Sequence, residues 1–354
     1  MKKIAILTIN DNNNYGNRLQ NYAIQRVLLS RGDCVETIWN NADRTLKDIS
    51  IIKLKTLFKK FKNDSDYSRY KNFSKFSKLI KHSRYKINNR KNPKYLNKKY
   101  DYFITGSDQV WNTNYKRFSF NDFLSFAEMG KRISFAASFG TSNIETKYGD
   151  RIKQEISSFR AISVREDAGK KIIENMGINK EIIVLVDPTM LLSAEEWDTV
   201  SNKPQKEIEK KYILNYFLGT IPDNWKSEIT KIADRYDCEV INILDKNDPY
   251  YTSGPSEFLY LIKNAFLVCT DSFHSSIFSI IYETPFIVFE RQGSEFCMNS
   301  RLDTLLSKFR LKDRKFNEKI PDTLLECDYT ETKHILEQER KKSYNFLSNA
   351  LNEK

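Results

Sequence analysis

Short apolar runs alternate along the chain with longer segments whose apolar residues recur at helical spacing. Runs of four to six apolar residues predict buried strands, and the amphipathic segments between them predict helices. The first pair is a strand over 4–9 and a helix over 17–31, which Gly32 is expected to end. Strands that alternate with helices in this way are typical of parallel sheets flanked by helices.

The pattern runs through two cycles, joined by a linker expected between Leu192 and Lys211. Strands of the first cycle are predicted at 4–9, 35–39, 102–105, 133–138, 161–164 and 182–186, and strands of the second at 212–217, 239–244, 266–269 and 286–289. Helices of the second cycle are predicted at 224–236, 255–264 and 275–282. We therefore expect an α/β protein with two Rossmann-like parallel-sheet domains that face each other across a cleft.

The expected domains are an N-terminal one over 1–192, with a basic helical insertion at about 44–99, and a C-terminal one over 193–328. Residues 329–354 are predicted to form a helix that could pack across both domains. No stretch approaches the ~20 apolar residues of a membrane-spanning helix. The run 4–9 breaks at Asn10 and reads as a strand rather than a signal sequence. Five cysteines without C-x-x-C spacing argue against a disulfide framework or a zinc site and favour the cytoplasm.

The net charge of +12 is concentrated in one segment. Between Arg44 and Lys99 there are 19 Lys and Arg against three Asp, so this segment carries +16 and the rest of the chain −4. Its aromatic and aliphatic side chains suit peripheral contact with an anionic membrane, at the inner face of the plasma membrane. The pattern also suits nucleic acid, which is not expected as a partner, and an ordinary solvated helical hairpin. Asp64-Ser-Asp66 has a D-x-D spacing, but it does not follow a strand and is not expected to bind a metal.

Polar residues follow the predicted strand at 266–269. Asp271 and His274 lie between the end of this strand and the start of the next helix, together with Ser272 and Ser275. Spare backbone N–H groups and the positive end of a helix dipole favour an anion at such a junction. We therefore expect His274 to be functional; the alternative is a buried histidine that only bonds Asp271 or a carbonyl group.

Polar turns also follow strands of the first cycle. After the first strand come Asn14, Gly16, Asn17 and Arg18, where Asn17 is expected to cap the helix and Gly16 to let a ligand approach the backbone. This turn lacks the G-x-G-x-x-G pattern, so a nicotinamide cofactor is disfavoured.

The turn after the strand at 102–105 combines a carboxylate, an amide and an indole, a mixture that often binds sugars. Its candidate residues are Gly106, Ser107, Asp108, Gln109 and Trp111. For Asp108 the alternative is a helix N-cap.

Arg165 follows the strand at 161–164, where its guanidinium could clamp a carboxylate or a phosphate. The competing interpretation is a salt bridge to Glu166 or Asp167. Asp187, before Pro188, is expected to belong to a plain turn.

Together these motifs resemble the polysaccharide pyruvyl transferase family. The resemblance rests on Asn14-Tyr15-Gly16-Asn17, Leu19-Gln20-Asn21-Tyr22-Ala23, Gly106-Ser107-Asp108-Gln109-Val110-Trp111-Asn112, Ser163-Val164-Arg165-Glu166, Asp187-Pro188-Thr189, Thr270-Asp271-Ser272-Phe273-His274, Phe278-Ser279 and Pro285-Phe286. It implies a glycosyltransferase-B-like fold. It also implies transfer of pyruvate from phosphoenolpyruvate to two hydroxyls of a sugar, in a cell-surface polysaccharide such as a capsule or exopolysaccharide, or in its lipid-linked precursor.

This chemistry needs a proton donor, a proton acceptor, and cationic or N–H groups for a carboxylate and a phosphate. His274 could donate a proton to carbon or hold the leaving phosphate, and Arg165 is the candidate clamp. Asp108 or Asp271 could accept a hydroxyl proton, although Asp271 is more readily expected to orient His274. Nothing in the scheme requires a metal or a cofactor.

Two positions depart from the family pattern. Ser272 stands where relatives often have an arginine, and Ser275 where they often have a glycine. Arg18, Arg291 or a lysine of the basic segment could supply the missing positive charge.

Two alternatives remain open at the level of the sequence. One is a glycosyltransferase that uses a nucleotide sugar, with residues 255–258 and the His274 region around the diphosphate. The other is a membrane- or nucleic-acid-binding module that uses the basic segment and has a degenerate cleft.

Overall fold

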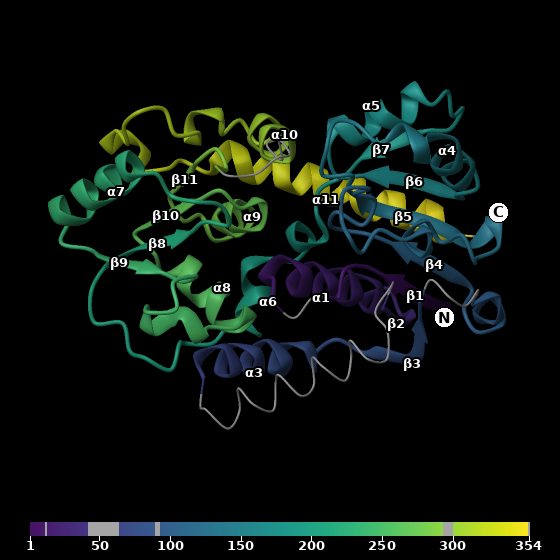
Figure 1. Cartoon of the computed structure of the whole chain (residues 1–354), viewed down its shortest axis with the longest axis horizontal. Helices are drawn as coiled ribbons and strands as arrows, with labels where there is room; N and C mark the ends of the chain where they lie inside the picture. Colours follow the sequence, from purple (N-terminus) through teal and green to yellow (C-terminus); the bar gives the residue numbers. More distant parts are fainter. Residues whose placement is uncertain (11–12, 42–63, 89–92, 293–299, 353–354) are drawn as a thin grey trace. The chain divides into compact units, whose positions relative to one another are not determined.

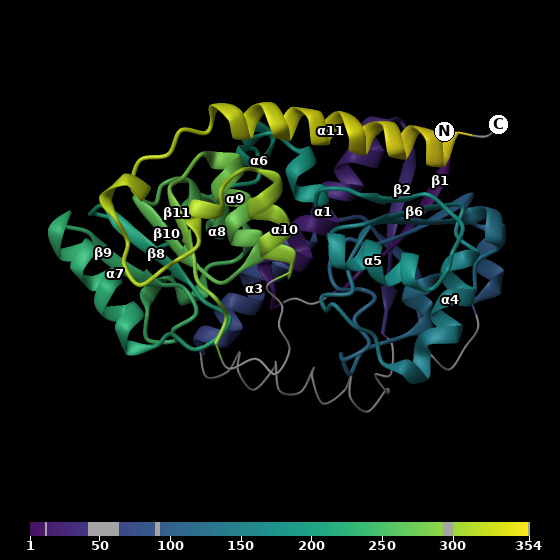
Figure 2. The ribbon, with the colours of Figure 1, turned by 90° about the horizontal axis from the view of Figure 1, so that it is seen from above.

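The computed structural model describes residues 1–10, 13–41, 64–88, 93–292 and 300–352, which form two compact units. Unit 1 contains the described residues of 1–41, 77–191 and 338–352. Unit 2 contains those of 64–76 and 192–337. Each unit is a parallel sheet with helices packed against it (Figure 1, Figure 2). The expected α/β class with two parallel sheets is confirmed.

Unit 1 has a seven-stranded sheet in the order β3-β2-β1-β4-β5-β6-β7, and all neighbouring strands are parallel. The strands are β1 (Lys3–Leu7), β2 (Cys34–Asn40), β3 (His82–Ile87), β4 (Tyr102–Thr105), β5 (Arg132–Ala137), β6 (Ala161–Val164) and β7 (Ile182–Val184). The strand order reverses between β1 and β4. The carboxyl ends of these two strands therefore form the crevice where open α/β sheets hold ligands.

The helices of unit 1 include α1 (Tyr15–Ser30), α4 (Gly149–Ser157), α5 (Asp167–Asn175) and the C-terminal part of α11 (Thr330–Leu351). Helix α1 begins two residues earlier than the sequence predicted. Its N-cap is Asn14, whose side chain accepts a hydrogen bond from the N–H of Asn17. The expectation that Asn17 caps the helix was wrong, because Asn17 already lies in the first turn.

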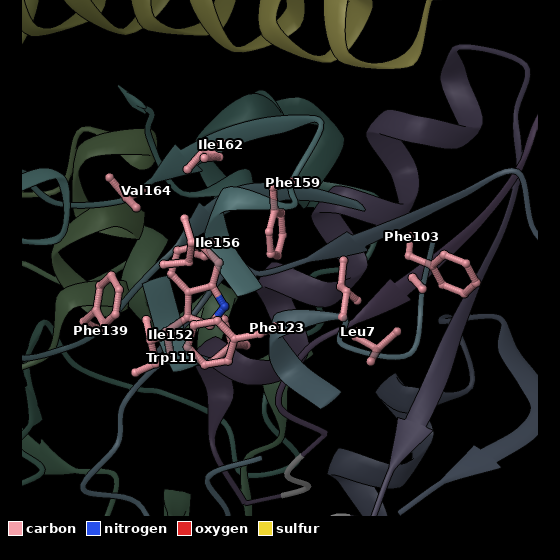
Figure 3. Packing of buried hydrophobic residues seen from close by; sticks show 14 of the residues in the cluster. Leu7, Phe103, Trp111, Phe123, Phe139, Ile152, Ile156, Phe159, Ile162 and Val164 are labelled. Carbon is pink, nitrogen blue, oxygen red and sulfur yellow. The ribbon is translucent and has the colours of Figure 1, made fainter. Parts of the chain in front are cut away.

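Large aromatic side chains fill the core of unit 1 beside the sheet. Trp111 is fully buried and stacks on Phe123, with ring centroids 5.2 Å apart and an angle of 9° between the rings. Phe139 and Phe159 pack against the same indole at 5.3 and 5.8 Å. Figure 3 shows these rings together with Ile152 and other aliphatic side chains. This core fixes the strand ends that carry the polar residues.

Unit 2 has a four-stranded parallel sheet in the order β11-β10-β8-β9. Its strands are β8 (Tyr212–Tyr216), β9 (Glu239–Asn242), β10 (Leu267–Thr270) and β11 (Phe286–Val288). Its helices are α3 (Ser65–Ser77), α6 (Ala194–Asp198), α7 (Asp223–Arg235), α8 (Pro255–Lys263), α9 (Phe273–Tyr282), α10 (Ser300–Lys308) and the N-terminal part of α11. Here the order reverses between β8 and β10, so their carboxyl ends form a second crevice.

Part of the segment expected to be a basic helical insertion is a strand. Residues 82–87 form β3, the edge of the unit 1 sheet, and pair in parallel with β2. Only Ser83 and Ile87 of this strand are buried, so its sequence lacks the apolar run that identifies a central strand. Residues 42–63 of the same segment lie outside the described part of the chain.

Helix α3, from the same basic segment, packs within unit 2 rather than standing apart as an insertion. Arg69 donates from Nη1 to the carbonyl oxygen of Tyr251 at 2.7 Å, and Asn72 donates to that of Thr252 at 2.8 Å. Phe73 and Phe76 on this helix are buried. Their rings are therefore occupied by packing, and the expected membrane contact of the segment stays a prediction.

Helix α11 contributes residues to both units, and its expected packing across the domains stays a prediction. In unit 2, Lys333 forms an ion pair with Glu283 at 2.8 Å. In unit 1, Ser348 accepts a hydrogen bond from Arg31, and Phe346 packs on Phe135. Among the described residues, no helix is both long and apolar enough to cross a membrane.

Candidate functional site

The crevice at β1 and β4 in unit 1 is held together by side chains from three elements. Gln20 of α1 donates from Nε2 to Oγ1 of Thr8 at 2.7 Å, and its Oε1 accepts from the N–H of Ser107 at 3.1 Å. Thr8 in turn donates to the carbonyl oxygen of Ser107. All three residues are fully buried, so the turn that follows β4 has a fixed position.

Arg165 lies at the centre of a buried charge cluster in unit 1. Its Nη1 is 2.8 Å from Oδ2 of Asp187, its Nη2 is 3.6 Å from Asp108 and its Nε is 4.0 Å from Glu166. Ser107 donates from Oγ to the same Asp187 oxygen at 2.7 Å. Burial lowers the pKa of the Arg165 guanidinium, but the three carboxylates raise it by more, so the pKa is raised above its ordinary value.

One arginine therefore faces three carboxylates. Asp187 lies in the expected turn, where it accepts from the N–H of Thr189, and it is also a structural partner of Arg165. The salt bridge to Glu166 that the sequence left open is present at the limit of ion-pair distance. Whether Arg165 also clamps an anionic substrate stays a prediction. A residue paired in this way acts first by neutralising the buried charge of its neighbours.

Asp108 lies in the left-handed region of backbone conformation, with φ of 68°. Aspartate tolerates this region better than most residues, and its Oδ1 accepts a hydrogen bond from the N–H of Gln109 at 2.8 Å. Gly106, also at positive φ, packs so closely on the carbonyl oxygen of Phe135 that a Cβ atom would not fit. The role of Asp108 as a proton acceptor stays a prediction.

Trp111 does not offer a surface for a sugar. Its side chain is fully buried, its Nε1 donates to the carbonyl oxygen of Asp122 at 3.1 Å, and aromatic rings cover its faces (Figure 3). The expectation that its indole stacks on a sugar ring was wrong. Its apolar area is instead used in the core, where an indole needs only one hydrogen-bond partner.

The turn before α1 also provides structural contacts. Gly16 and Asn17 are buried in the first turn of α1, and Arg18 donates from Nη2 to the carbonyl oxygen of Ile9 at 3.1 Å. A second contact of the same nitrogen is with Oδ1 of Asn10 at 3.3 Å. Arg18 therefore closes the carboxyl end of β1.

In unit 2, Asp271 ties three segments of chain together at the carboxyl ends of β8 and β10. Its two carboxylate oxygens accept hydrogen bonds from the N–H groups of Leu218 and Gly219, at 2.7 and 2.8 Å. Arg291 donates from Nε to Oδ2 at 3.1 Å and from Nη2 to the backbone oxygen of Asp271 at 3.0 Å. The carboxylate is thus engaged by these groups, and its expected role in orienting His274 stays a prediction.

His274 is the second residue of α9 and is 7% exposed. Ser272 is the N-cap of this helix: its Oγ accepts from the N–H of Ser275 at 3.5 Å, and its carbonyl oxygen accepts from the N–H of Ser276. Serine at position 272 therefore has a capping role. The positive end of the α9 dipole lies at the same place as His274.

A second arginine near this helix start was missed from the sequence. Arg301 of α10 is buried, and its guanidinium lies 5.7 Å from the centre of the Phe273 ring. It is 27 residues beyond His274 in the chain, so no local motif connects the two. Arg291 and Arg301 thus bring two positive charges to the start of α9. That they replace the family arginine at position 272 stays a prediction.

Asp64 and Asp66, the D-x-D pair, are engaged at the start of α3. Asp64 accepts from the N–H of Asp66 at 2.8 Å. Asp66 accepts from the hydroxyl of Tyr251 at 2.7 Å and pairs with Lys246 at 2.9 Å. In the described part of the chain, no group of three or more His, Cys, Asp or Glu residues is arranged to hold a metal ion.

The family model for polysaccharide pyruvyl transferase matches residues 14–293. The chain belongs to this family. The match spans both units and includes the Asp108, Arg165 and His274 regions, and it makes the protein a transferase. The expected resemblance is therefore confirmed.

The chain also resembles solved structures in fold. UDP-N-acetylglucosamine 2-epimerase from Methanocaldococcus jannaschii is 14% identical, with 95% of this chain and 92% of that chain covered and a TM-score of 0.51. A Listeria monocytogenes protein proposed to be the same enzyme is 12% identical, with 99% and 91% covered and a TM-score of 0.51. These similarities confirm the glycosyltransferase-B-like fold. Comparison with curated proteins finds no match.

Proposed function

We propose that this protein moves the pyruvyl group of phosphoenolpyruvate onto two hydroxyls of a sugar, forming a cyclic ketal and releasing phosphate. The acceptor is a cell-surface polysaccharide or its lipid-linked precursor, and the reaction takes place on the cytoplasmic side of the membrane. Family membership supports the reaction class. The observation that carries the donor assignment is the gathering of His274, Arg291 and Arg301 at the N-terminal end of α9.

This arrangement suits an anion with two charged groups. Phosphoenolpyruvate carries a carboxylate and a phosphate, and both prefer a helix N-terminus flanked by guanidinium groups. In our proposal Arg301 contacts one of these groups directly. Arg291 holds Asp271, and through it the 218–219 backbone, in position.

The proposed transfer begins at the methylene carbon of phosphoenolpyruvate. His274 donates a proton to the methylene carbon of phosphoenolpyruvate, and a sugar hydroxyl adds to C2 and gives up its proton to a base. The C–O bond to phosphate then breaks, and the second hydroxyl attacks C2 to close the ring. Of the two hydroxyl protons, one restores the acid and the other leaves with phosphate. The scheme uses no metal or cofactor.

Donor recognition can be tested without knowing the acceptor. Calorimetric titration of the wild type with phosphoenolpyruvate should show binding, and Arg301→Met should weaken it by roughly tenfold or more, since a charge-assisted hydrogen bond is lost. Arg310→Met is the matched control, because Arg310 is exposed and pairs with Glu331 on the surface. Equal binding by all three proteins would overturn the placement of the donor.

Turnover is tested by phosphate release from phosphoenolpyruvate with a panel of free and lipid-linked glycans. His274→Ala should lower kcat by roughly 10²–10⁴-fold, the usual contribution of a general acid. His334→Ala, on the exposed face of α11, is the control. Undiminished release by His274→Ala would exclude His274 as the acid. Turnover of a nucleotide sugar instead of phosphoenolpyruvate would favour a glycosyltransferase.

A further inference from the structure

A separate pocket lies in unit 2 beneath helix α7, at the carboxyl ends of β8 and β9. Figure 1 and Figure 2 both show α7 beside these strands. The pocket has a volume of about 430 Å³, within the range of small-molecule sites. Its lining residues are Asn215, Phe217, Ile221, Lys226, Ile229, Thr230, Val240, Asn242, Leu244 and Asp245.

Half of the lining residues are apolar, and strand and helix periodicity brings them to the pocket. Val240 and Asn242 are two residues apart on β9, so they point to the same face of the sheet. Asn215 comes from β8, and Phe217 follows directly after the end of that strand. Ile229 of α7, one turn after Lys226, closes the pocket from the opposite side. A ligand there would lie between aliphatic side chains and an aromatic ring.

Two amides interrupt the apolar wall. Asn215 and Asn242 are directly paired residues of neighbouring strands, and Nδ2 of Asn215 donates to Oδ1 of Asn242 at 2.9 Å. Asn215 is 7% exposed, and its buried Oδ1 has no hydrogen-bond partner among the described residues. A buried acceptor without a partner costs roughly 1–3 kcal/mol, so one that lines a pocket points to a ligand.

The amide pair presents one donor beside one acceptor. Asn215 offers its Oδ1, and Asn242 contributes its NH₂ group; if both amides were turned over, the donor and the acceptor would exchange places and the pair would remain. A flat ring that carries an acceptor next to a donor on one edge matches this arrangement. A single asparagine recognises the edge of adenine with one donor and one acceptor, and here the donor and the acceptor come from two asparagines.

The rim of the pocket adds one positive and one negative side chain. Lys226 and Asp245 both line the pocket, and Lys226 also pairs with exposed Asp223 at 3.0 Å. The opposite charges give the rim no strong preference for an anion or a cation. A neutral ligand with an apolar ring therefore fits better than a charged one.

We propose that this pocket binds a nucleoside through the hydrogen-bonding edge of its base. The proposal is independent of phosphoenolpyruvate and of the site at α9. In this assignment the base is held between Phe217, Ile229 and Val240, and its edge pairs with Asn215 and Asn242.

The test is direct binding of the four nucleosides uridine, cytidine, adenosine and guanosine to the full-length protein, measured by calorimetry and ligand-observed NMR. At least one should bind. Its analogue methylated on the pairing nitrogen, such as 3-methyluridine for uridine, should bind at least about tenfold more weakly, because the donor is blocked. Failure of all four nucleosides to bind would overturn the proposal, as would equal binding of the methylated analogue.

Two variants test whether the nucleoside binds in this pocket. Asn215→Leu should weaken nucleoside binding by about tenfold or more, whereas Asn224→Leu, at an exposed position of α7, should leave it unchanged. Val240→Trp should also abolish binding by filling the pocket while keeping both amides, which guards against a folding defect of Asn215→Leu. Unchanged binding in both pocket variants would overturn the assignment. Phosphoenolpyruvate binding should be unaffected in either variant, so this result and a failure at the α9 site can be distinguished.

Discussion

The Nη1 atom of Arg165 lies 2.8 Å from Oδ2 of Asp187, and both side chains are almost completely buried in unit 1. Asp108 and Glu166 approach the same guanidinium. Removing one partner of a buried ion pair leaves uncompensated charge, which typically costs about 3–5 kcal/mol. We therefore expect Arg165→Met to lower the free energy of unfolding of the protein by about that amount.

Urea denaturation checks this expectation. Arg132→Met is a useful comparison, since among the described residues Arg132 pairs with a single carboxylate, Glu155 at 2.8 Å. A loss below about 1 kcal/mol in Arg165→Met would show that the three carboxylates do not depend on this charge. If an Arg165 variant loses activity, its stability must therefore be measured as well, so that a folding defect is distinguished from a catalytic one.

The close packing around Gly219 in unit 2 leaves no room for a larger residue. A Cβ atom there would lie 2.5 Å from the backbone oxygen of Gln292 and 2.9 Å from Cγ of Arg291. Gly219→Ala must therefore displace the hydrogen bond to Asp271, and we expect it to weaken binding of phosphoenolpyruvate by roughly tenfold. Gly149→Ala is the control, because nothing lies within 4 Å of its added Cβ. Equal affinity of both variants, measured by calorimetry, would contradict the expectation.

The lowered pKa of His82 leads us to expect that the stability of the protein depends on pH. Burial, and then the charge of Arg18, lower the pKa of His82 from 6.5 to about 4. Between these two pKa values the unfolded chain binds more protons than the folded protein. The contribution of His82 to the free energy of unfolding is therefore complete above pH 6.5 and is lost as the pH falls toward 4. After allowance for its partial exposure, the loss is on the order of 1–2 kcal/mol.

Thermal unfolding between pH 4.5 and 7.5 measures this effect. His82→Gln removes the titrating group, and its melting temperature should fall less steeply with decreasing pH than that of the wild type. Identical slopes would show that His82 is protonated as easily in the folded protein as in the unfolded chain. The ring also stacks on Trp39, with centroids 4.3 Å apart, so the variant should be slightly less stable at neutral pH.

Arg69 links α3 to the rest of unit 2. Its Nη1 contacts the carbonyl oxygens of Tyr251 and Ser253 at 2.7 and 3.4 Å. Arg69→Ala removes charge-assisted hydrogen bonds worth about 1.5–3 kcal/mol. We expect faster amide hydrogen exchange over 65–77 in this variant, whereas exposed Lys71→Ala should exchange like the wild type. Unchanged exchange in Arg69→Ala would mean that the packing of Phe73 and Phe76 alone holds the helix.

The sequence predicted the central strands well because their apolar runs are buried on both faces of the sheet. β4 and β10, for example, are buried at every position. β3 escaped prediction because an edge strand needs few apolar residues, and its lysine and arginine side chains resembled a solvated helix. Edge strands rich in charged residues are therefore the elements that a sequence pattern most easily misses.

The site was predicted in part, for a similar reason. Asp271 and His274 share one short motif at a strand end, so their neighbourhood could be read locally. The partners of Asp271 could not be predicted from the sequence. Two of them are the backbone N–H groups of Leu218 and Gly219, and every residue except proline has such a group. Trp111 shows the converse limit: an indole after a strand suits a sugar site and a core equally well until its burial is known.

Helix α11 has a consequence for how the protein is made. Its Phe346 packs on Phe135, and its Ser348 meets Arg31, so residues from the beginning and the end of the sequence complete the same unit. During translation, Arg31 is synthesised long before Ser348. Unit 1 can therefore gain its last helix only after all of unit 2 has been synthesised, and a fragment that stops at Leu191 would leave that face of unit 1 uncovered.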